Sequence, residues 1–244
     1  MTDLALALAL ADAADAISLA RFGARDLKVE TKPDLTPVSE ADRAVEAELR
    51  RLLVRERPGD AILGEEEGEA GTGPRRWILD PIDGTRNYVR GIPVWATLIA
   101  LEEEGETRLG VVSAPALQRR WHAERGGGAW AGDSQLHVSA VRRVEDAVLS
   151  FALERPTPAL AARAWHARGY GDFWSHMLVA EGAVDGAIDV PGVHIYDLAA
   201  LQPIVEEAGG MFTDHTGARR IDGVGAISSN GCLHDALVAA LTAD

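Results

Sequence analysis

The chain of 244 residues contains a single cysteine, Cys232, and can therefore form no internal disulfide bond. This lack is typical of proteins from reducing compartments, so we expect a cytoplasmic location. Cys232 has no obvious electropositive activator in its sequence neighbourhood, which predicts a structural role for it rather than a reactive thiol. At this length a chain buries a core without disulfide or metal staples.

Long apolar segments are absent as well. None reaches the roughly 18 to 20 residues that a membrane-spanning helix needs. The apolar segment 3–22 carries Asp3, Asp12 and Asp15, which predicts an amphipathic helix rather than a secretion signal. We therefore expect a soluble protein without a membrane partner.

Basic residues are scarce: 24 Lys and Arg stand against 38 Asp and Glu, a formal net charge of −14. Such a charge repels nucleic acid and anionic membranes, so neither is expected as a partner. The sequence also lacks the G-x-x-x-x-G-K-[ST] loop, the G-x-S-x-G elbow and the H-E-x-x-H pair. These absences argue against P-loop, serine-hydrolase and zincin chemistry.

Hydrophobic periodicity divides the chain into a first half of helices followed by strands and a second half that alternates the two. Ser39 is a predicted N-cap. The predicted helices are 3–22, 40–56, 157–169, the start of 173–190, 196–210 and the end of 225–244. The predicted strands lie within 61–68, 75–80, 94–115 and 118–133, at 147–153, at the end of 173–190 and at the start of 225–244. We expect one unit, 1–244, with a soft division near residue 140 into lobes 1–140 and 141–244.

The stretch WILDPIDGTRN, residues 77–87, runs from an apolar strand into two carboxylates. Pro81 has no N–H for a sheet, which predicts that the strand ends at Asp80. A turn there brings Asp83 beside Asp80, and a divalent cation would relieve the repulsion between them. A plain strand-end turn with a solvated Asp83 is the alternative. The following Gly84 and Thr85 favour a helix start, whose free N–H groups bind phosphate.

These residues match D-P-(I/L)-D-G-T-x-N, and the chain thereby resembles the metal-dependent inositol monophosphatase superfamily. The resemblance extends through TPVSEAD (36–42), GEEEG (64–68), RGGGAW (125–130) and YDLAALQPIVEEAGG (196–210), nearly the whole chain. It implies an α+β fold of layered αβαβα type, with mixed sheets sandwiched between helix layers. It also implies Mg²⁺-dependent hydrolysis of a small-molecule phosphate monoester, homodimers, and inhibition by lithium.

The resemblance further implies individual roles. The implied metal ligands are Glu65, Asp80, the Ile82 carbonyl, Asp83 and Asp197. They would hold two or three Mg²⁺ ions, and Glu65, as the bridging ligand, also belongs to the catalytic set. Asp42 and Thr85 would act on the attacking water, and the N–H groups of Gly84 and Thr85 would bind the phosphate. Hard oxygen ligands of this kind suit Mg²⁺ and phosphoryl transfer.

The segment YGDFWSH, residues 170–176, carries Asp172 where inositol-type members have alanine, and so resembles the bacterial histidinol-phosphate phosphatases of this superfamily, enzymes of histidine biosynthesis. A carboxylate suits the ammonium and imidazole of histidinol phosphate. Alternatively, Asp172 caps a helix that begins near Phe173. Asp189 matches a substrate-contacting glutamate, although one extra residue precedes Asp197 here. Tyr196 replaces the usual tryptophan.

The sequence is also compatible with other functions. Inositol 1-phosphate, or a broader set of sugar phosphates, is the alternative substrate, and a non-catalytic binding relative is a remote alternative, since no ligand is lost. The acids at 102–106 predict a solvated hairpin tip. Glu66 is a candidate neighbour of the metal ligands, and His194 is a candidate for approaching the site.

Overall fold

The computed structural model describes residues 1–152 and 158–242, so position 153 of the predicted strand 147–153 and position 157 of the predicted helix 157–169 lie outside them. An eight-stranded sheet has the order β10-β9-β8-β7-β6-β5-β3-β4. Its strands are β3 (Ala61–Gly64), β4 (Gly68–Ala70), β5 (Arg75–Asp83), β6 (Ala96–Glu103), β7 (Glu106–Ala114), β8 (Arg119–Glu124), β9 (Ala129–Ala131) and β10 (Ser134–Gln135). Only the β3–β5 pair is parallel among its described pairs.

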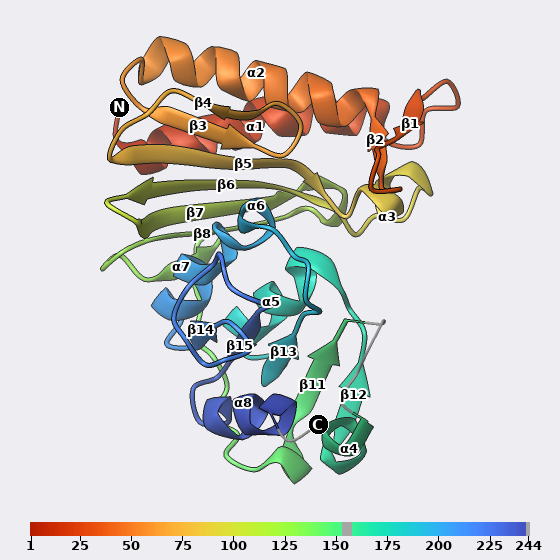
Figure 1. Cartoon of the computed structure of the whole chain (residues 1–244), viewed down its shortest axis with the longest axis vertical. Coiled ribbons are helices and arrows are strands. Elements are labelled where there is room, and N and C mark those ends of the chain that lie inside the picture. The colour runs from red at the N-terminus through yellow and green to blue at the C-terminus, as the bar shows by residue number, and fades with distance from the viewer. Residues whose placement is uncertain (153–157, 243–244) are drawn as a thin grey trace.

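Helices α1 (Asp3–Arg21) and α2 (Glu40–Glu56) cover one face of this sheet (Figure 1). Their apolar sides pack with the inward side chains of β5, β6 and β7, for example Leu10 and Leu49 with Trp77. Ser39 caps α2, as predicted, and the structure shows that it does so in a capping box with Asp42. A short hairpin, β1 (Val29–Thr31) with β2 (Pro37–Ser39), joins the two helices.

A five-stranded sheet of order β12-β11-β13-β15-β14 forms from the second half of the chain. Its strands are β11 (Val148–Phe151), β12 (His166–Arg168), β13 (Gly186–Ile188), β14 (Met211–Thr213) and β15 (Ile227–Ser229). The β11–β12 and β11–β13 pairs are parallel, and the other two are antiparallel. This sheet is therefore mixed.

Helices lie between the two sheets and beyond the smaller one (Figure 1). Those between are α5 (Asp172–Ala180), α6 (Ile195–Leu198) and α7 (Leu201–Glu207), and α4 (Pro158–Arg163) and α8 (His234–Thr242) lie at the far end; α3 (Thr85–Val89) and the 3₁₀ turns η1 (Pro115–Leu117) and η2 (Val144–Asp146) complete the described elements. Phe173, Met177 and Ile204 share a core with strands of the large sheet. The predicted layered αβαβα arrangement is confirmed, whereas the soft division near residue 140 stays a prediction.

The structure corrects the predicted end of the strand at Asp80. Strand β5 continues to Asp83, with a register shift against β6 between Asp80 and Asp83. The Pro81 carbonyl accepts a hydrogen bond from Thr97 Oγ1 at 2.8 Å, so β6 still holds this segment. Proline is tolerated because it lies in a bulge, where no ladder N–H is required.

Two predicted helices are also wrong in part. The segment 157–169 contains α4 followed by β12, because residues 166–168 pair with β11. The segment 196–210 is split into α6 and α7, since Pro203 offers no N–H to the Ala199 carbonyl. At the break the Ala200 carbonyl lies over Gly110 of β7, where an added Cβ would come within 2.1 Å of it.

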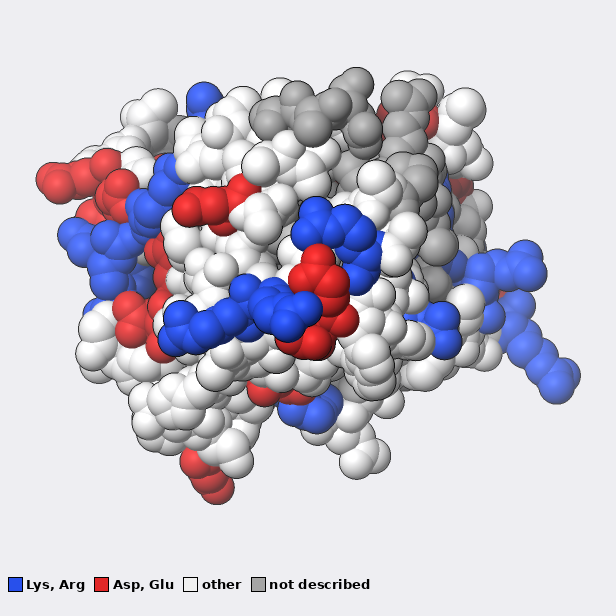
Figure 2. Space-filling model, turned by 90° about the horizontal axis from the view of Figure 1, so that it is seen from below, with Lys and Arg blue, Asp and Glu red and all other residues white. Residues whose placement is uncertain are grey.

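Surface charge is mixed where it is visible. On the face in Figure 2, basic and acidic side chains are interspersed among uncharged residues. The hairpin tip at 102–106 likewise pairs its acids with arginines, such as Glu102 with Arg76 at 3.1 Å. Cys232 is exposed, and the structural role predicted for it stays a prediction. Among the described helices, none is both long and apolar enough to cross a membrane.

Candidate metal and phosphate site

Three of the predicted metal ligands come together in the structure. Asp80, Asp83 and Asp197 each place a carboxylate oxygen within 4.8 Å of the others. Asp80 and Asp83 lie on either side of the bulge in β5, and Asp197 lies in α6, which packs against that strand. The bulge brings the side chains of positions 80 and 83 to one place, as the stretch WILDPIDGTRN predicts by a turn.

Backbone N–H groups orient two of these carboxylates. Phe173 N donates to Asp83 Oδ2 at 2.6 Å, and His194 N donates to Asp197 Oδ2 at 2.6 Å. Asp80 is 1% exposed, and its Oδ1 has no hydrogen-bond partner in the described part of the chain. A buried carboxylate oxygen without a partner is costly, and a cation is the natural partner for it.

The electrostatics of the cluster favour a bound cation. Burial, reinforced by the neighbouring carboxylates, raises the pKa of Asp80 and the pKa of Asp83 well above the ordinary range. Burial is also the main cause that raises the pKa of Asp197 to about 7. Carboxylate oxygens are the ligands that Mg²⁺ prefers, so the residues present fit this ion.

We expect the metal-free protein to lose thermal stability as the pH rises from about 4 to about 7. A carboxyl whose pKa is raised on folding holds a proton that the unfolded chain, with a pKa near 3.9, has released. The contribution of this carboxyl to stability is complete below the unfolded pKa. It is lost as the pH rises through the folded pKa, which is about 7 for Asp197. Mg²⁺ should therefore raise the melting temperature more at pH 8 than at pH 5.5, as differential scanning fluorimetry can measure. Equal shifts at both pH values would contradict this.

Glu65 follows β3 and is held in an ion pair. Lys32 Nζ, from the β1–β2 hairpin, lies 2.8 Å from Glu65 Oε1 and 2.7 Å from Glu66 Oε1. Burial raises the pKa of Glu66 to about 6 against the opposing effect of Lys32. The ammonium shows that this pair of carboxylates accepts a cation. Sequence analysis missed Lys32, because no local pattern relates it to a turn more than thirty positions away.

A second residue that sequence analysis missed supports the same turn. Glu46 of α2 is fully buried and accepts hydrogen bonds from Glu66 N at 2.7 Å and Glu67 N at 3.0 Å. An added Cβ at Gly64 would come within 2.1 Å of Glu46 Oε1, so only glycine fits before Glu65. In the sequence, Glu46 is one of several acidic residues of a predicted helix, and nothing indicated this contact.

Asp42 and Thr85 are brought into contact, as expected of a pair that acts on one water. Thr85 Oγ1 lies 3.1 Å from Asp42 Oδ1 and 2.9 Å from the Ile82 carbonyl. The other Asp42 oxygen accepts from Ser39 N and Ser39 Oγ, at 2.8 and 2.5 Å. Asp42 is fully buried, and this burial raises its pKa. The capping box of α2 thus aims one Asp42 oxygen at Thr85.

Gly84 joins β5 to α3 in the left-handed region, at φ 82°. An added Cβ would come within 3.0 Å of the Val94 carbonyl, so a larger residue is disfavoured twice. Because α3 begins at Thr85, the first N–H groups of this segment have no partner within the helix. The predicted phosphate contact with Gly84 and Thr85 is consistent with this geometry and stays a prediction.

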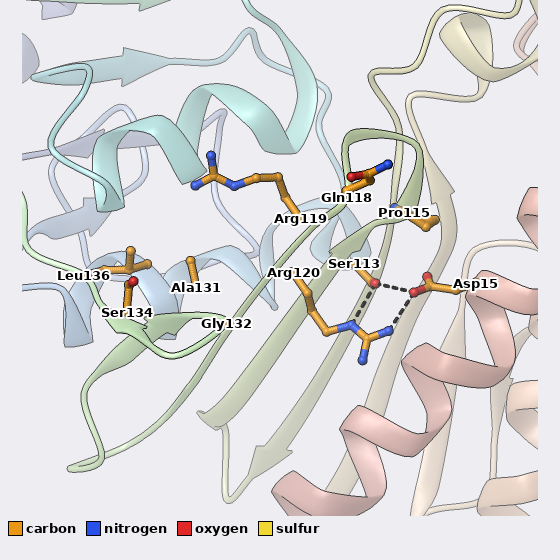
Figure 3. Close-up of a pocket in the computed structure, with 10 residues that line it drawn as sticks. All are labelled: Asp15, Ser113, Pro115, Gln118, Arg119, Arg120, Ala131, Gly132, Ser134 and Leu136. Carbon is orange, nitrogen blue, oxygen red and sulfur yellow. Dashed lines mark hydrogen bonds and ion pairs between the residues drawn. The ribbon is translucent and has the colours of Figure 1, made fainter.

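A pocket of about 390 Å³ opens beside the carboxylate cluster. Its lining includes Asp83 and Asp197 of the cluster together with Asp172, Asp189 and Arg86. A separate pocket of about 610 Å³ contains Arg120, which donates to Asp15 at 2.6 Å and to Ser113 at 2.9 Å (Figure 3). Both arginines that line it are thus already paired, Arg119 with Glu181, and we assign the chemistry to the smaller pocket.

Asp172 begins α5 but does not cap it. The N-cap is Gly171, which makes no side-chain hydrogen bond, and the Phe173 N–H is taken by Asp83 instead. The capping alternative for Asp172 is therefore wrong. Its carboxylate accepts a hydrogen bond from Asn87 Nδ2 at 3.3 Å. Its backbone φ is 49°, a value that few residues other than Gly, Asp and Asn adopt readily. Burial, reinforced by Asp189, raises the pKa of Asp172 to about 6.

Asp189 lines the same pocket and is 9% exposed. Its Oδ2 lies 2.8 Å from Nε2 of the fully buried His176, a partner that sequence analysis missed. His194 stacks on Tyr196 with ring centroids 5.1 Å apart, and it approaches the site through its N–H bond to Asp197.

Comparison with known proteins agrees with this geometry. The model of the inositol monophosphatase family matches residues 1–243. Histidinol-phosphatase of Mycobacterium tuberculosis is 52% identical over 256 residues, covering 99% of this chain and 98% of the relative. That of Streptomyces coelicolor is 51% identical over 256 residues, covering 98% and 96%. The solved structure of an IMPase from Thermotoga maritima superposes with a TM-score of 0.91 at 32% identity, covering 100% of this chain and 98% of that one. The chain therefore belongs to the inositol monophosphatase family.

Proposed function

We propose that this phosphatase hydrolyses histidinol phosphate to histidinol and inorganic phosphate and depends on Mg²⁺. The family membership and the relatives named histidinol-phosphatase make it a phosphatase. One structural observation carries the choice of substrate. Two carboxylates outside the metal cluster, Asp172 and Asp189, line the pocket beside it. An acidic pocket suits the cationic part of histidinol phosphate better than a neutral sugar.

The proposed metal ligands are Glu65, Asp80, the Ile82 carbonyl, Asp83 and Asp197, for two or three Mg²⁺ ions. When bound, Mg²⁺ supplies a Lewis acid that activates water and neutralises charge on the phosphate oxygens. Asp42 and Thr85 orient the attacking water, and Asp42 accepts its proton. The N–H groups of Gly84 and Thr85 hold the phosphate as negative charge develops.

Inositol 1-phosphate is the second candidate substrate. The structural match to an IMPase along the full chain favours it. A homodimer, a cytoplasmic location, a role in histidine biosynthesis and inhibition by lithium are further parts of the proposal that rest on the family resemblance.

The test is the rate of phosphate release at saturating Mg²⁺ from histidinol phosphate, inositol 1-phosphate, fructose 1,6-bisphosphate and adenosine 3′,5′-bisphosphate. We expect kcat/KM to be highest for histidinol phosphate by at least about tenfold, the value of one good hydrogen bond to a charged group. A higher kcat/KM for inositol 1-phosphate would replace the proposed substrate. Failure to hydrolyse any ester would favour a binding protein without catalysis.

Replacing Asp172 by Asn should lower kcat/KM for histidinol phosphate about 10- to 100-fold, because one charge-assisted hydrogen bond is lost. Hydrolysis of inositol 1-phosphate should change little, since its ring carries no positive charge. Steady-state kinetics on both esters measures the effect. Asp133→Asn, an exposed carboxylate outside the pocket, is the control. Equal losses on both esters would return Asp172 to a purely structural role.

A further inference from the structure

The pocket residue Asp189 is held at several points. Its N–H donates to the Ala226 carbonyl at 2.9 Å, and its own carbonyl accepts from His215 Nε2 at 2.7 Å. Its carboxylate Oδ2 meets His176 Nε2 at 2.8 Å. With one oxygen engaged, the second oxygen is the one that can serve a ligand in the pocket. The position and orientation of this carboxylate are therefore set by the protein.

His176 comes from the side of α5 that faces the small sheet. Its ring is 0% exposed and packs on Phe212 with centroids 5.4 Å apart. Nδ1 lies 2.8 Å from Ser228 Oγ on β15. A carboxylate only accepts hydrogen bonds, so Nε2 carries a proton and donates the hydrogen bond that Asp189 accepts. Ser228 then donates to Nδ1, and this fixes the tautomer.

The order Ser228, His176, Asp189 resembles that of a serine hydrolase, but the two arrangements differ in accessibility. Ser228 and His176 are both 0% exposed, so no substrate reaches the serine oxygen. Only Asp189, at the end of the chain of hydrogen bonds, lines the pocket. The arrangement can therefore orient a pocket carboxylate and cannot supply a nucleophile.

We propose that His176 is a positioning residue that presents Asp189 as a second pocket carboxylate, in addition to Asp172, to the positively charged group of the substrate. This inference rests on the proposed preference for a cationic ester and names what in this chain enforces it. A buried donor with a second hydrogen bond behind it holds a carboxylate more rigidly than solvent does. Asp189 and Asp172 line the same pocket, so both carboxylates can face one bound cationic group.

The test compares two substitutions of nearly equal polarity. His176→Gln is long enough to place its amide nitrogen near the position of Nε2, whereas His176→Asn reaches only as far as Nδ1 and can satisfy Ser228 alone. We expect His176→Asn to raise KM for histidinol phosphate about tenfold with kcat changed less than about threefold. His176→Gln should restore most of the affinity. Melting temperatures of both variants check that the fold is intact.

A double-mutant cycle separates positioning from general packing. If His176 acts through Asp189, the effects of His176→Asn and Asp189→Asn on KM should be far from additive, because the second substitution finds the contact already lost. Additive effects, or equal losses on histidinol phosphate and inositol 1-phosphate, would overturn the inference. The same holds if His176→Gln and His176→Asn behave alike.

Failure of the proposed substrate is distinguishable from failure of this inference. Phosphoethanolamine carries an ammonium group and glycerol 1-phosphate does not. If the wild type ignores histidinol phosphate but prefers phosphoethanolamine in a way that His176→Asn removes, the inference stands and the substrate is wrong. A preference for cationic esters that His176→Asn leaves intact would overturn the inference and leave the proposed function standing.

Discussion

Asp83→Asn is expected to lower kcat/KM at least about a thousandfold at any Mg²⁺ concentration that saturates the wild type. The substitution removes a charged ligand while it keeps the shape of the side chain and an oxygen that can accept from Phe173 N, 2.6 Å away in the native protein. Removing one partner of a buried pair of opposite charges, here the carboxylate that faces the metal, costs about 4 kcal/mol. Each 1.4 kcal/mol is about tenfold in rate. Phosphate release from histidinol phosphate measures the loss.

Stability distinguishes this loss from misfolding. In metal-free protein at pH 7.5, burial beside Asp172 and Asp197 makes the Asp83 carboxyl costly to ionise, so Asp83→Asn should melt at the wild-type temperature or above it. Asp133→Asn, far from the cluster, should change neither activity nor metal dependence. An Asp83→Asn protein that is as active as the wild type would remove Asp83 from the metal site.

Thr85→Ala should lower kcat about 10²- to 10⁴-fold and change KM less than about threefold, because Thr85 is proposed to orient the water after the substrate is bound. The hydroxyl lies 3.1 Å from Asp42, which holds it in place. Thr85→Ser keeps the hydroxyl and should retain most of the activity. Steady-state kinetics of the two variants would place Thr85 in substrate binding instead if KM rose while kcat stayed constant.

The sequence predicted those parts of the site that local patterns encode. Asp80, Asp83, Gly84 and Thr85 lie within six positions, and Ser39 is the predicted N-cap of the helix that follows it. The continuation of β5 past Pro81 could not be predicted, because β6 holds the bulge through Thr97. Local propensity failed where a distant strand competed for the backbone, as at 166–168, and where Pro203 splits the helix predicted at 196–210.

The remaining contacts join segments that are far apart in the chain. Asp83 takes the N–H of Phe173, ninety residues away, and so replaces Asp172 as the acceptor at the start of α5. Lys32 reaches Glu65 from a hairpin, and His176 in α5 reaches Asp189 directly after β13. A single sequence carries no signal for such pairs, since each member alone is an ordinary polar residue.

We propose that the carboxylate cluster of Asp80, Asp83 and Asp197 holds the metal on which hydrolysis of the ester depends. The most direct measurement strips the protein with a chelator, removes the chelator, and titrates Mg²⁺ while phosphate release from histidinol phosphate is followed. We expect no turnover without metal and a saturable return of full activity with Mg²⁺. Unchanged phosphate release by the metal-free protein would contradict it.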